Sequence, residues 1–224
     1  MGTLYLVRHG QASFGADDYD QLSALGQQQS VRLGQHFAAQ GLRFDAVLTG
    51  TLRRHAQTWQ GIAQGLGAAD LKPLSWPGLN EYDSLALIAA VHPQPMDKPE
   101  SPEQVRAHFR LLRAGLAKWM AGTVQPVGMP SYAQFVAGVV DALDWVRAHG
   151  VGRKVLLVSS GGPISTAVGQ VLGMRAEATI ELNLRIRNSS VTEFVVTPKR
   201  HQLLSYNTLP HLNPAAEQDW VTYA

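Results

Sequence analysis

The sequence predicts an α/β protein, a three-layer sandwich in which helices cover both faces of a mostly parallel central sheet. Short apolar segments typical of buried strands alternate along the chain with amphipathic segments of helical period. The segment KVLLV, residues 154–158, is apolar after its first residue, as in strands buried on both faces. Hydrophobic residues make up 45% of the 224 and charged residues 16%, a globular composition. We expect one domain over residues 1–224.

The first part of the chain is expected to supply two strands and two helices. Residues 3–7 form a short, β-rich apolar run that leads into a loop. Ser23 is suited to cap a helix that ends at Gly41. A second strand is predicted over 44–48, and a helix over 52–67 follows it and ends on a glycine.

The segment from about 84 to 130 is predicted to be a helical insertion, because prolines bound it and it interrupts the alternation of strands and helices. Its stretch 92–102 holds four prolines and cannot form regular structure. Ser101 then caps a helix that carries proline in its first position and is expected to run to about Met120.

The last part of the chain contains the strongest strand. Ser131, with glutamine three residues later, predicts a capping box that opens a helix to about residue 150. Strand 154–158 is followed by a glycine-rich turn and a helix beginning near Pro163. Residues 180–196 alternate in polarity and are expected to form a pair of strands, and 202–206 a final one.

Composition excludes several classes of protein and site. The formal charge of +2 is too small to indicate a nucleic-acid partner. The absence of cysteine excludes disulfides, thiolate metal sites and a cysteine nucleophile, and fits a reducing compartment. The first apolar run is too short for a secretory signal or a membrane span. No cluster with metal-ligand spacing is present, so we expect a cytoplasmic protein without a metal, a membrane or a nucleic-acid partner; the sequence makes no prediction of oligomeric state.

Arg8 and His9 follow the first predicted strand directly. In open α/β sheets ligands bind at the carboxyl ends of the strands, so these two side chains stand where chemistry is usually placed. An isolated Arg-His pair has an ordinary interpretation as two surface residues. The motifs that follow along the chain favour the functional interpretation instead.

Six segments, in this order, resemble the motifs of the histidine phosphatase superfamily, the group that includes the phosphoglycerate mutases. They are the strand ending in RHG at 8–10, L-S-x-x-G at 22–26, TGTLRRHAQT at 49–58, LNEYD at 79–83, VLLVSSGGPI at 155–164 and NSSVTEF at 188–194. The third is similar to the family's S-S-x-L-x-R-A-x-Q-T and the fifth to its V-x-V-S-H-G-G. The resemblance covers roughly residues 3–212.

The resemblance implies a phosphatase that acts on a small phosphorylated substrate without metal or organic cofactor. His9 would be the nucleophile and carry the phosphoryl group, and Glu81 would be first the general acid and then the base. Arg8 and Arg54 would bind the phosphate oxygens through their planar forks of donors, and Ser13 would add a donor from the loop after His9. The ordinary alternative for each arginine is a surface salt bridge.

Ser160 departs from the family's pattern, because the family has its second histidine at this position. Ser160 and Gly161 lie in a strand-to-helix turn, where free backbone N–H groups and the positive end of the helix favour an anion such as phosphate. Three interpretations stay open. The serine could be a working hydroxyl donor, the chain could be a weak or inactive protein that binds phosphorylated ligands, or the motif could only close a turn.

A histidine from elsewhere could replace the missing one. His55 lies next to Arg54 on a predicted helix and is therefore rotated from it by about 100°, which predicts that it points elsewhere. His92 in the proline-rich segment and His211 in the tail are further candidates, and little in the sequence favours either.

Two other activities fit less well. A serine hydrolase acting through Ser160 would need G-x-S-x-G, but Val158 stands where the first glycine is required. A phosphoglycerate mutase is disfavoured because the segment 84–130 is short for that branch.

Overall fold

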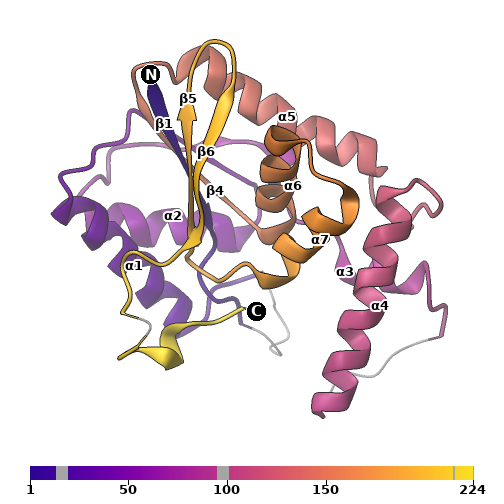
Figure 1. Ribbon diagram of the computed structural model, residues 1–224. Helices are drawn as coiled ribbons and strands as arrows, with labels where there is room; N and C mark the ends of the chain where they lie inside the picture. Colours follow the sequence, from indigo (N-terminus) through magenta and orange to yellow (C-terminus); the bar gives the residue numbers. More distant parts are fainter. Residues whose placement is uncertain (14–19, 95–100, 214, 224) are drawn as a thin grey trace.

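A six-stranded sheet organises the computed structural model, which describes residues 1–13, 20–94, 101–213 and 215–223 (Figure 1). The strands, in chain order, are β1 (Gly2–Arg8), β2 (Ala46–Thr49), β3 (Leu74–Ser75), β4 (Lys154–Ser159), β5 (Val191–Val196) and β6 (His201–Thr208). Their order in the sheet is β3-β2-β4-β1-β5-β6. The first four of these are parallel, whereas β5 runs antiparallel to β1 and to β6.

Helices cover both faces of this sheet, which confirms the predicted three-layer α/β class. They are α1 (Ala24–Ala39), α2 (Arg53–Leu66), α3 (Ser84–Ala89), α4 (Pro102–Met120), α5 (Tyr132–His149), α6 (Gly161–Leu172) and α7 (Ala176–Arg185). The pair α1 and α2 lies on one face, and α5 and α6 lie on the other (Figure 1).

Strand β4 shows how the two faces are built. Val155 and Leu157 belong to the apolar cluster beneath α5 and α6, and Leu156 and Val158 to the cluster beneath α1 and α2. All four are buried. Successive side chains of a strand point to opposite faces, so a continuous apolar run is required where both faces are covered.

The predicted helix signals are confirmed at several ends. Ser23 accepts a hydrogen bond from the Gly26 amide at the start of α1, and Ser101 and Ser131 each form a capping box. Gly67 ends α2 with φ of 69°, in the left-handed region that favours glycine.

The predicted pair of strands over 180–196 is wrong in its first half. Residues Ala176–Arg185 form α7, and only Val191–Val196 form a strand. The alternation of IELNLRI fits a strand period, but Ile180 and Leu184 also stand four residues apart and share one face of a helix. Packing of α7 against α6 decides between the two periods.

The segment 84–130 contributes α3 and α4, which pack on each other beside α7 (Figure 1). Leu116 and Trp119 of α4 are buried and join the same apolar cluster as α5. The proline-rich stretch 92–102 lies partly outside the described residues, since 95–100 are not among them. Among the helices that the structure describes, none is both long and apolar enough to cross a bilayer.

Candidate active site

The turns after β1 and β4 lie side by side. The two strands are parallel neighbours in which Arg8 is level with Ser159, so the next residues, His9 and Ser160, leave the sheet at the same edge. The His9 amide donates to the Ser159 carbonyl at 2.8 Å and holds the two turns together. The sheet topology thus brings together two motifs that are about 150 residues apart in the sequence.

The hydrogen bonds of His9 define which ring nitrogen can act as a nucleophile. Nδ1 lies 2.7 Å from the Gly10 carbonyl, and because a carbonyl only accepts, Nδ1 must carry the proton. The lone pair of the neutral ring is then on Nε2. Burial, followed by the charges of Arg8 and Arg54, holds the pKa of His9 well below 6.5, so the ring is neutral at pH 7.

The loop that carries His9 is fixed to α1 and α2. The Gly10 amide donates to Thr58 Oγ1 at 3.1 Å, and this hydroxyl donates to the Arg54 carbonyl at 2.7 Å. A Cβ on Gly10 would lie 2.3 Å from the Gly26 carbonyl oxygen of α1, so only glycine permits this close approach. Thr58, the last residue of the TGTLRRHAQT segment, therefore positions His9 of the RHG segment.

Two guanidinium groups reach the same pocket from different elements. Arg8 Nη1, at the end of β1, donates to the Ile186 and Tyr223 carbonyls at 2.5 and 2.7 Å. Arg54 Nη1, at the start of α2, donates to Asp20 Oδ1 at 2.9 Å. The positive charges of both arginines lower the pKa of His9.

Glu81 occupies the N-terminus of α6. Its two carboxyl oxygens accept from the Gly162 amide at 3.1 and 3.2 Å, and Oε1 also accepts from the Tyr82 amide at 3.3 Å. The sequence predicts an anion such as phosphate at this helix end, and in the structure the Glu81 carboxyl group occupies the Gly162 amide instead. Burial raises the pKa of Glu81, against the opposing effects of the Gly162 amide and the two arginines.

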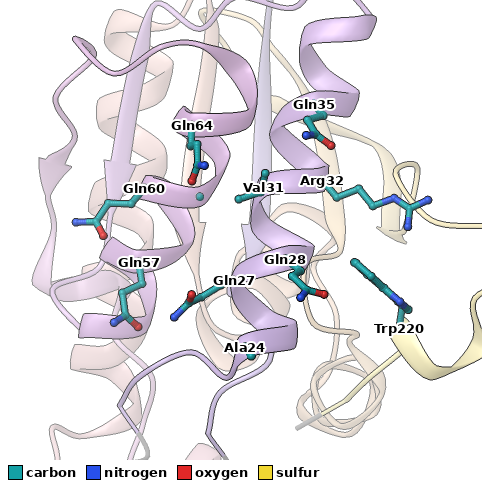
Figure 2. A pocket seen from close by; sticks show the side chains of 11 residues that line it. Ala24, Gln27, Gln28, Val31, Arg32, Gln35, Gln57, Gln60, Gln64 and Trp220 are labelled. Atoms are coloured by element: carbon teal, nitrogen blue, oxygen red, sulfur yellow. The ribbon is translucent and has the colours of Figure 1, made fainter.

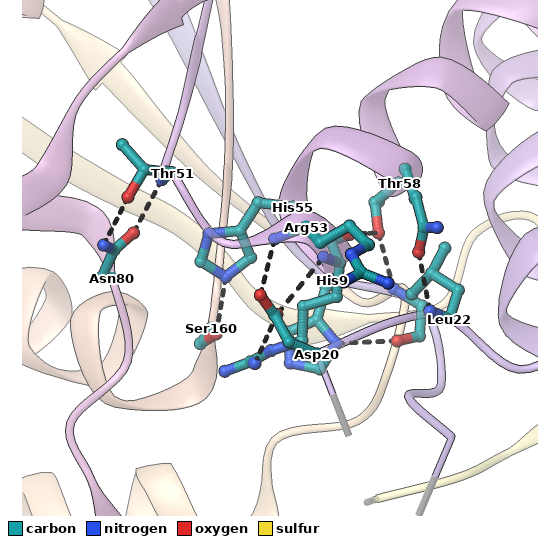
Figure 3. Close-up of polar contacts among 12 residues, drawn as sticks. His9, Asp20, Leu22, Thr51, Arg53, His55, Thr58, Asn80 and Ser160 are labelled. Atoms are coloured by element: carbon teal, nitrogen blue, oxygen red, sulfur yellow. Dashed lines mark hydrogen bonds and ion pairs between the residues drawn. The ribbon is translucent and has the colours of Figure 1, made fainter. Parts of the chain in front are cut away.

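His55 lies at the site, so the prediction that it points elsewhere is wrong. Its Nε2 is 2.7 Å from Ser160 Oγ, and its ring centroid is 5.8 Å from that of His9 (Figure 3). The rotation between Arg54 and His55 is real, but the first turn of α2 packs against the end of β4, and both residues are buried. Sequence spacing gives a direction around the helix axis and does not say what lies in that direction.

An open pocket of about 440 Å³ joins these groups. Five of the predicted site residues line it: Arg8, His9, Arg54, Glu81 and Gly161. Ser160 is fully buried and lies behind this lining, next to His55. Ser13 lies outside the lining, and its amide donates to the Gln21 carbonyl instead. The histidine candidate His211 is also outside it and is bonded to Ser189.

A second, larger groove of about 630 Å³ lies between α1 and α2 (Figure 2). Glutamines form most of its described lining, and Arg32, whose guanidinium stacks on Trp220, is the charged residue in it. This lining offers no histidine or carboxylate for phosphoryl transfer. Within the described ranges, no group of three or more His, Cys, Asp or Glu side chains could hold a metal ion.

Comparison with known proteins places the chain in a family. Residues 4–209 match the model of the histidine phosphatase superfamily (branch 1), and the chain belongs to this superfamily. The resemblance drawn from the motifs is thereby confirmed.

Curated relatives match over a shorter stretch. The 2,3-bisphosphoglycerate-dependent phosphoglycerate mutase of Mesorhizobium japonicum is 39% identical over 88 residues, which are 36% of this chain and 42% of the relative. The mutase of Brucella anthropi is 37% identical over 87 residues, again 36% and 42%. The match thus spans less than half the length of these relatives.

Solved structures share the fold over nearly the whole chain. A phosphoserine phosphatase of Entamoeba histolytica, in complex with phosphoserine, superposes with a TM-score of 0.66 at 20% identity and covers 95% of this chain and 100% of that one. A mycobacterial glucosyl-3-phosphoglycerate phosphatase gives 0.65 at 21% identity, covering 93% and 99%. At these identities the likeness establishes the fold, and the activity must be argued from the site.

Proposed function

We propose that this protein hydrolyses a phosphomonoester through a phosphohistidine on His9, without metal or organic cofactor. The observation that carries the proposal is the hydrogen bond from His9 Nδ1 to the Gly10 carbonyl. It leaves the lone pair of a neutral ring on Nε2, beside a pocket lined by two guanidinium groups and one carboxyl group.

In the first step the phosphoryl group passes from the substrate to the enzyme. His9 Nε2 attacks phosphorus, the bond to the ester oxygen breaks, and Arg8 and Arg54 bind the equatorial oxygens. Glu81 donates its proton to the leaving oxygen, so an alcohol departs. The raised pKa of Glu81 supports this role, because a carboxyl group with a raised pKa keeps its proton to higher pH and can act as the acid.

In the second step water removes the phosphoryl group. The Glu81 carboxylate accepts a proton from water as the oxygen attacks phosphorus, the P–N bond breaks, and phosphate leaves. His9 returns to its neutral state and Glu81 to its protonated state. The enzyme is thereby restored for another turnover.

The pocket favours a substrate whose alcohol part is partly apolar. Beyond the charged end, its wall includes Leu85, Phe109, Leu112 and Leu184. Both arginines of the described lining lie at the His9 end, so the described wall offers no guanidinium for a second phosphate. This distribution supports hydrolysis of a monoester over a mutase reaction on a bisphosphorylated compound.

A second candidate is binding of a phosphorylated ligand without turnover. Ser160 favours it, because a neutral hydroxyl stands where the family's second histidine is expected. A serine hydrolase is less well supported, even though Ser160 and His55 form a Ser-His pair. In the described part of the chain His55 Nδ1 has no hydrogen-bond partner, so the acid that would orient the base is missing.

Trapping of the intermediate tests the proposal. Rapid quenching of the enzyme with a radiolabelled phosphomonoester should leave acid-labile phosphate on the protein. His9→Ala should carry no label and lose on the order of 10⁴-fold or more in kcat, as expected for a nucleophile. His149→Ala, which changes a remote, exposed histidine, should behave as wild type. Label that persists in His9→Ala would refute the assignment, and tight ligand binding without label in wild type would support the second candidate.

A further inference from the structure

Among the positions that differ from the family's motifs, the structure brings three together. In the segment TGTLRRHAQT, Gly50 stands at the second serine of the pattern, and His55 stands at its alanine. In VLLVSSGGPI, Ser160 stands at the histidine. The chain has therefore lost an imidazole at the end of β4 and gained one on α2 whose Nε2 is 2.7 Å from Ser160 Oγ.

Gly50 makes room for the new ring. A Cβ at this position would lie 2.2 Å from His55 Nδ1 and 2.8 Å from Asn80 Oδ1. Contacts this short do not occur in folded proteins, so a residue with a side chain at 50 and His55 in its present place exclude each other. The glycine and the histidine are thus coupled through a single packing contact.

The hydrogen bonds indicate where the protons lie. His55 and Ser160 are both fully buried, and burial together with Arg54 lowers the pKa of His55 to about 3, so its ring is neutral. Among the described residues Nδ1 has no partner, and a buried N–H without an acceptor is rarer than a buried acceptor without a donor. The proton is therefore best placed on Nε2, which donates to Ser160 Oγ.

This bond leaves the Ser160 hydroxyl proton available to the site. Ser160 is the N-cap residue of α6, yet its side chain makes no capping bond to that helix. Its neighbour Gly161 lines the pocket, and the His9 ring lies beside the His55 ring (Figure 3). Ser160, although buried behind the lining, follows β4 level with His9 after β1, so a donor here lies next to the residue that would receive the phosphoryl group.

We propose that His55 and Ser160 together replace the imidazole missing from the end of β4. His55 Nε2–H holds Ser160 Oγ in place, and the Ser160 hydroxyl donates to an oxygen of the phosphoryl group during its transfer. Ser160 is the catalytic residue of the pair and His55 the positioning residue. The inference rests on the proposed function, and it interprets the departures at 50, 55 and 160 as one relocation rather than as decay of the site.

A double-mutant cycle tests the pair. His55→Ala and Ser160→Ala should each lower the rate of phosphohistidine formation by about 10²-fold, as expected for the loss of one donor aimed at transition-state charge. The double variant H55A/S160A should lose little more than either single variant, because the two residues act as one unit. KM should change far less than kcat.

A variant that restores the family's residues supplies the matched control. The triple variant G50S/H55A/S160H restores the family's residues at all three positions and should recover at least about tenfold in rate over His55→Ala. His55→Gln keeps a long polar side chain at this position and so controls for the loss of packing that His55→Ala causes. Melting temperatures near that of wild type in His55→Gln and the double variant, together with slow phosphorylation, would separate positioning from unfolding.

The outcomes distinguish this inference from the proposed function. If wild type is labelled and His55→Ala is labelled equally fast, or if the two single losses multiply in the double variant, the relocation is refuted while the phosphatase assignment stands. If wild type carries no label, that assignment fails. The affinity for inorganic phosphate then tests the His55–Ser160 pair. An equal loss of phosphate affinity in His55→Ala and Ser160→Ala supports the pair, and unchanged affinity refutes it.

Discussion

The turns after β1 and β4 each have an imidazole at the candidate site, but they obtain it in different ways. At the β1 turn, the imidazole and its orienting acceptor are consecutive residues, because His9 Nδ1 donates to the Gly10 carbonyl. At the β4 turn, the hydroxyl of Ser160 belongs to the turn and the imidazole of His55 comes from α2, 105 residues away in the sequence. One turn is complete within its own motif, and the other depends on the packing of a separate helix.

Under the proposed relocation, a functional group keeps its place in space and changes its place in the chain. The α2 helix contacts both turns, since its Thr58 holds Gly10 and its His55 contacts Ser160. A side chain added to the buried face of α2 can therefore reach the end of β4. In the proposed mechanism the β1 turn has no such freedom, because His9 Nε2 must face the phosphorus atom.

Among the changes that test the difference between the two turns, replacement of Glu81 should have the largest effect. The Gly162 amide, just after the β4 turn, donates a hydrogen bond to the Glu81 carboxyl group. Glu81→Gln should lower kcat/KM for an alkyl phosphate by about 10²–10⁴-fold, because the alkoxide then leaves without a proton. It should lower kcat/KM for 4-nitrophenyl phosphate far less, since that leaving group needs no proton.

The pH dependence of the same reaction checks the role. Since the protonated form of Glu81 is the acid, wild-type kcat/KM for the alkyl phosphate should fall as pH rises through its raised pKa. Glu81→Gln should lack this fall. Equal losses on both substrates would argue that Glu81 only stabilises the β4 turn.

A smaller effect is expected from replacement of Gly50. Of the two turns, only the one after β4 depends on this glycine, through the contact of His55 with Ser160. Gly50→Ala should destabilise the protein by about 1–3 kcal/mol, because the added Cβ overlaps His55 and Asn80. Adding His55→Ala should relieve most of this loss, although the imidazole site is then empty. Denaturant unfolding of the two single variants and the double variant measures the coupling, and additive losses would show that the glycine and the histidine are independent.

A last effect is the contribution of His55 to the pH dependence of stability, which is small within any one pH unit. Its pKa in the folded state is about 3 against an ordinary value of 6.5, so below pH 6.5 the unfolded chain binds a proton that the folded protein does not. The stability from this group is complete above pH 6.5 and falls by about 1 kcal/mol for each unit as the pH decreases toward 3.

Replacement of His55 isolates this contribution. His55→Gln should flatten the decline in the free energy of unfolding between pH 6.5 and 5, by about 1 kcal/mol per pH unit, and His149→Gln should leave it unchanged. Urea unfolding at several pH values measures the slope. An unaltered slope in His55→Gln would mean that the imidazole is not buried in the neutral form.

Much of the fold could be predicted because local signals and burial agree. The four apolar residues of β4 require two covered faces, and the serine caps fix where α4 and α5 begin. The prediction failed at 180–185, where the apolar spacing of a short segment fits both a strand and a helix. Contact with α6 decides there, and no local signal reports it.

The candidate site divides in the same way. The sequence by itself determined the nucleophile candidate His9 and its partners Arg8, Arg54 and Glu81, because each lies in a motif with its own spacing. It also indicated that Ser160 stands where the resemblance places the family's second histidine. Only the tertiary structure decided that His55 lies against that serine, that Glu81 occupies the start of α6, and that Ser13 is not part of the pocket lining. The physical reason is that a motif records the order of residues within one element, whereas a contact between α2 and the end of β4 depends on how two elements pack.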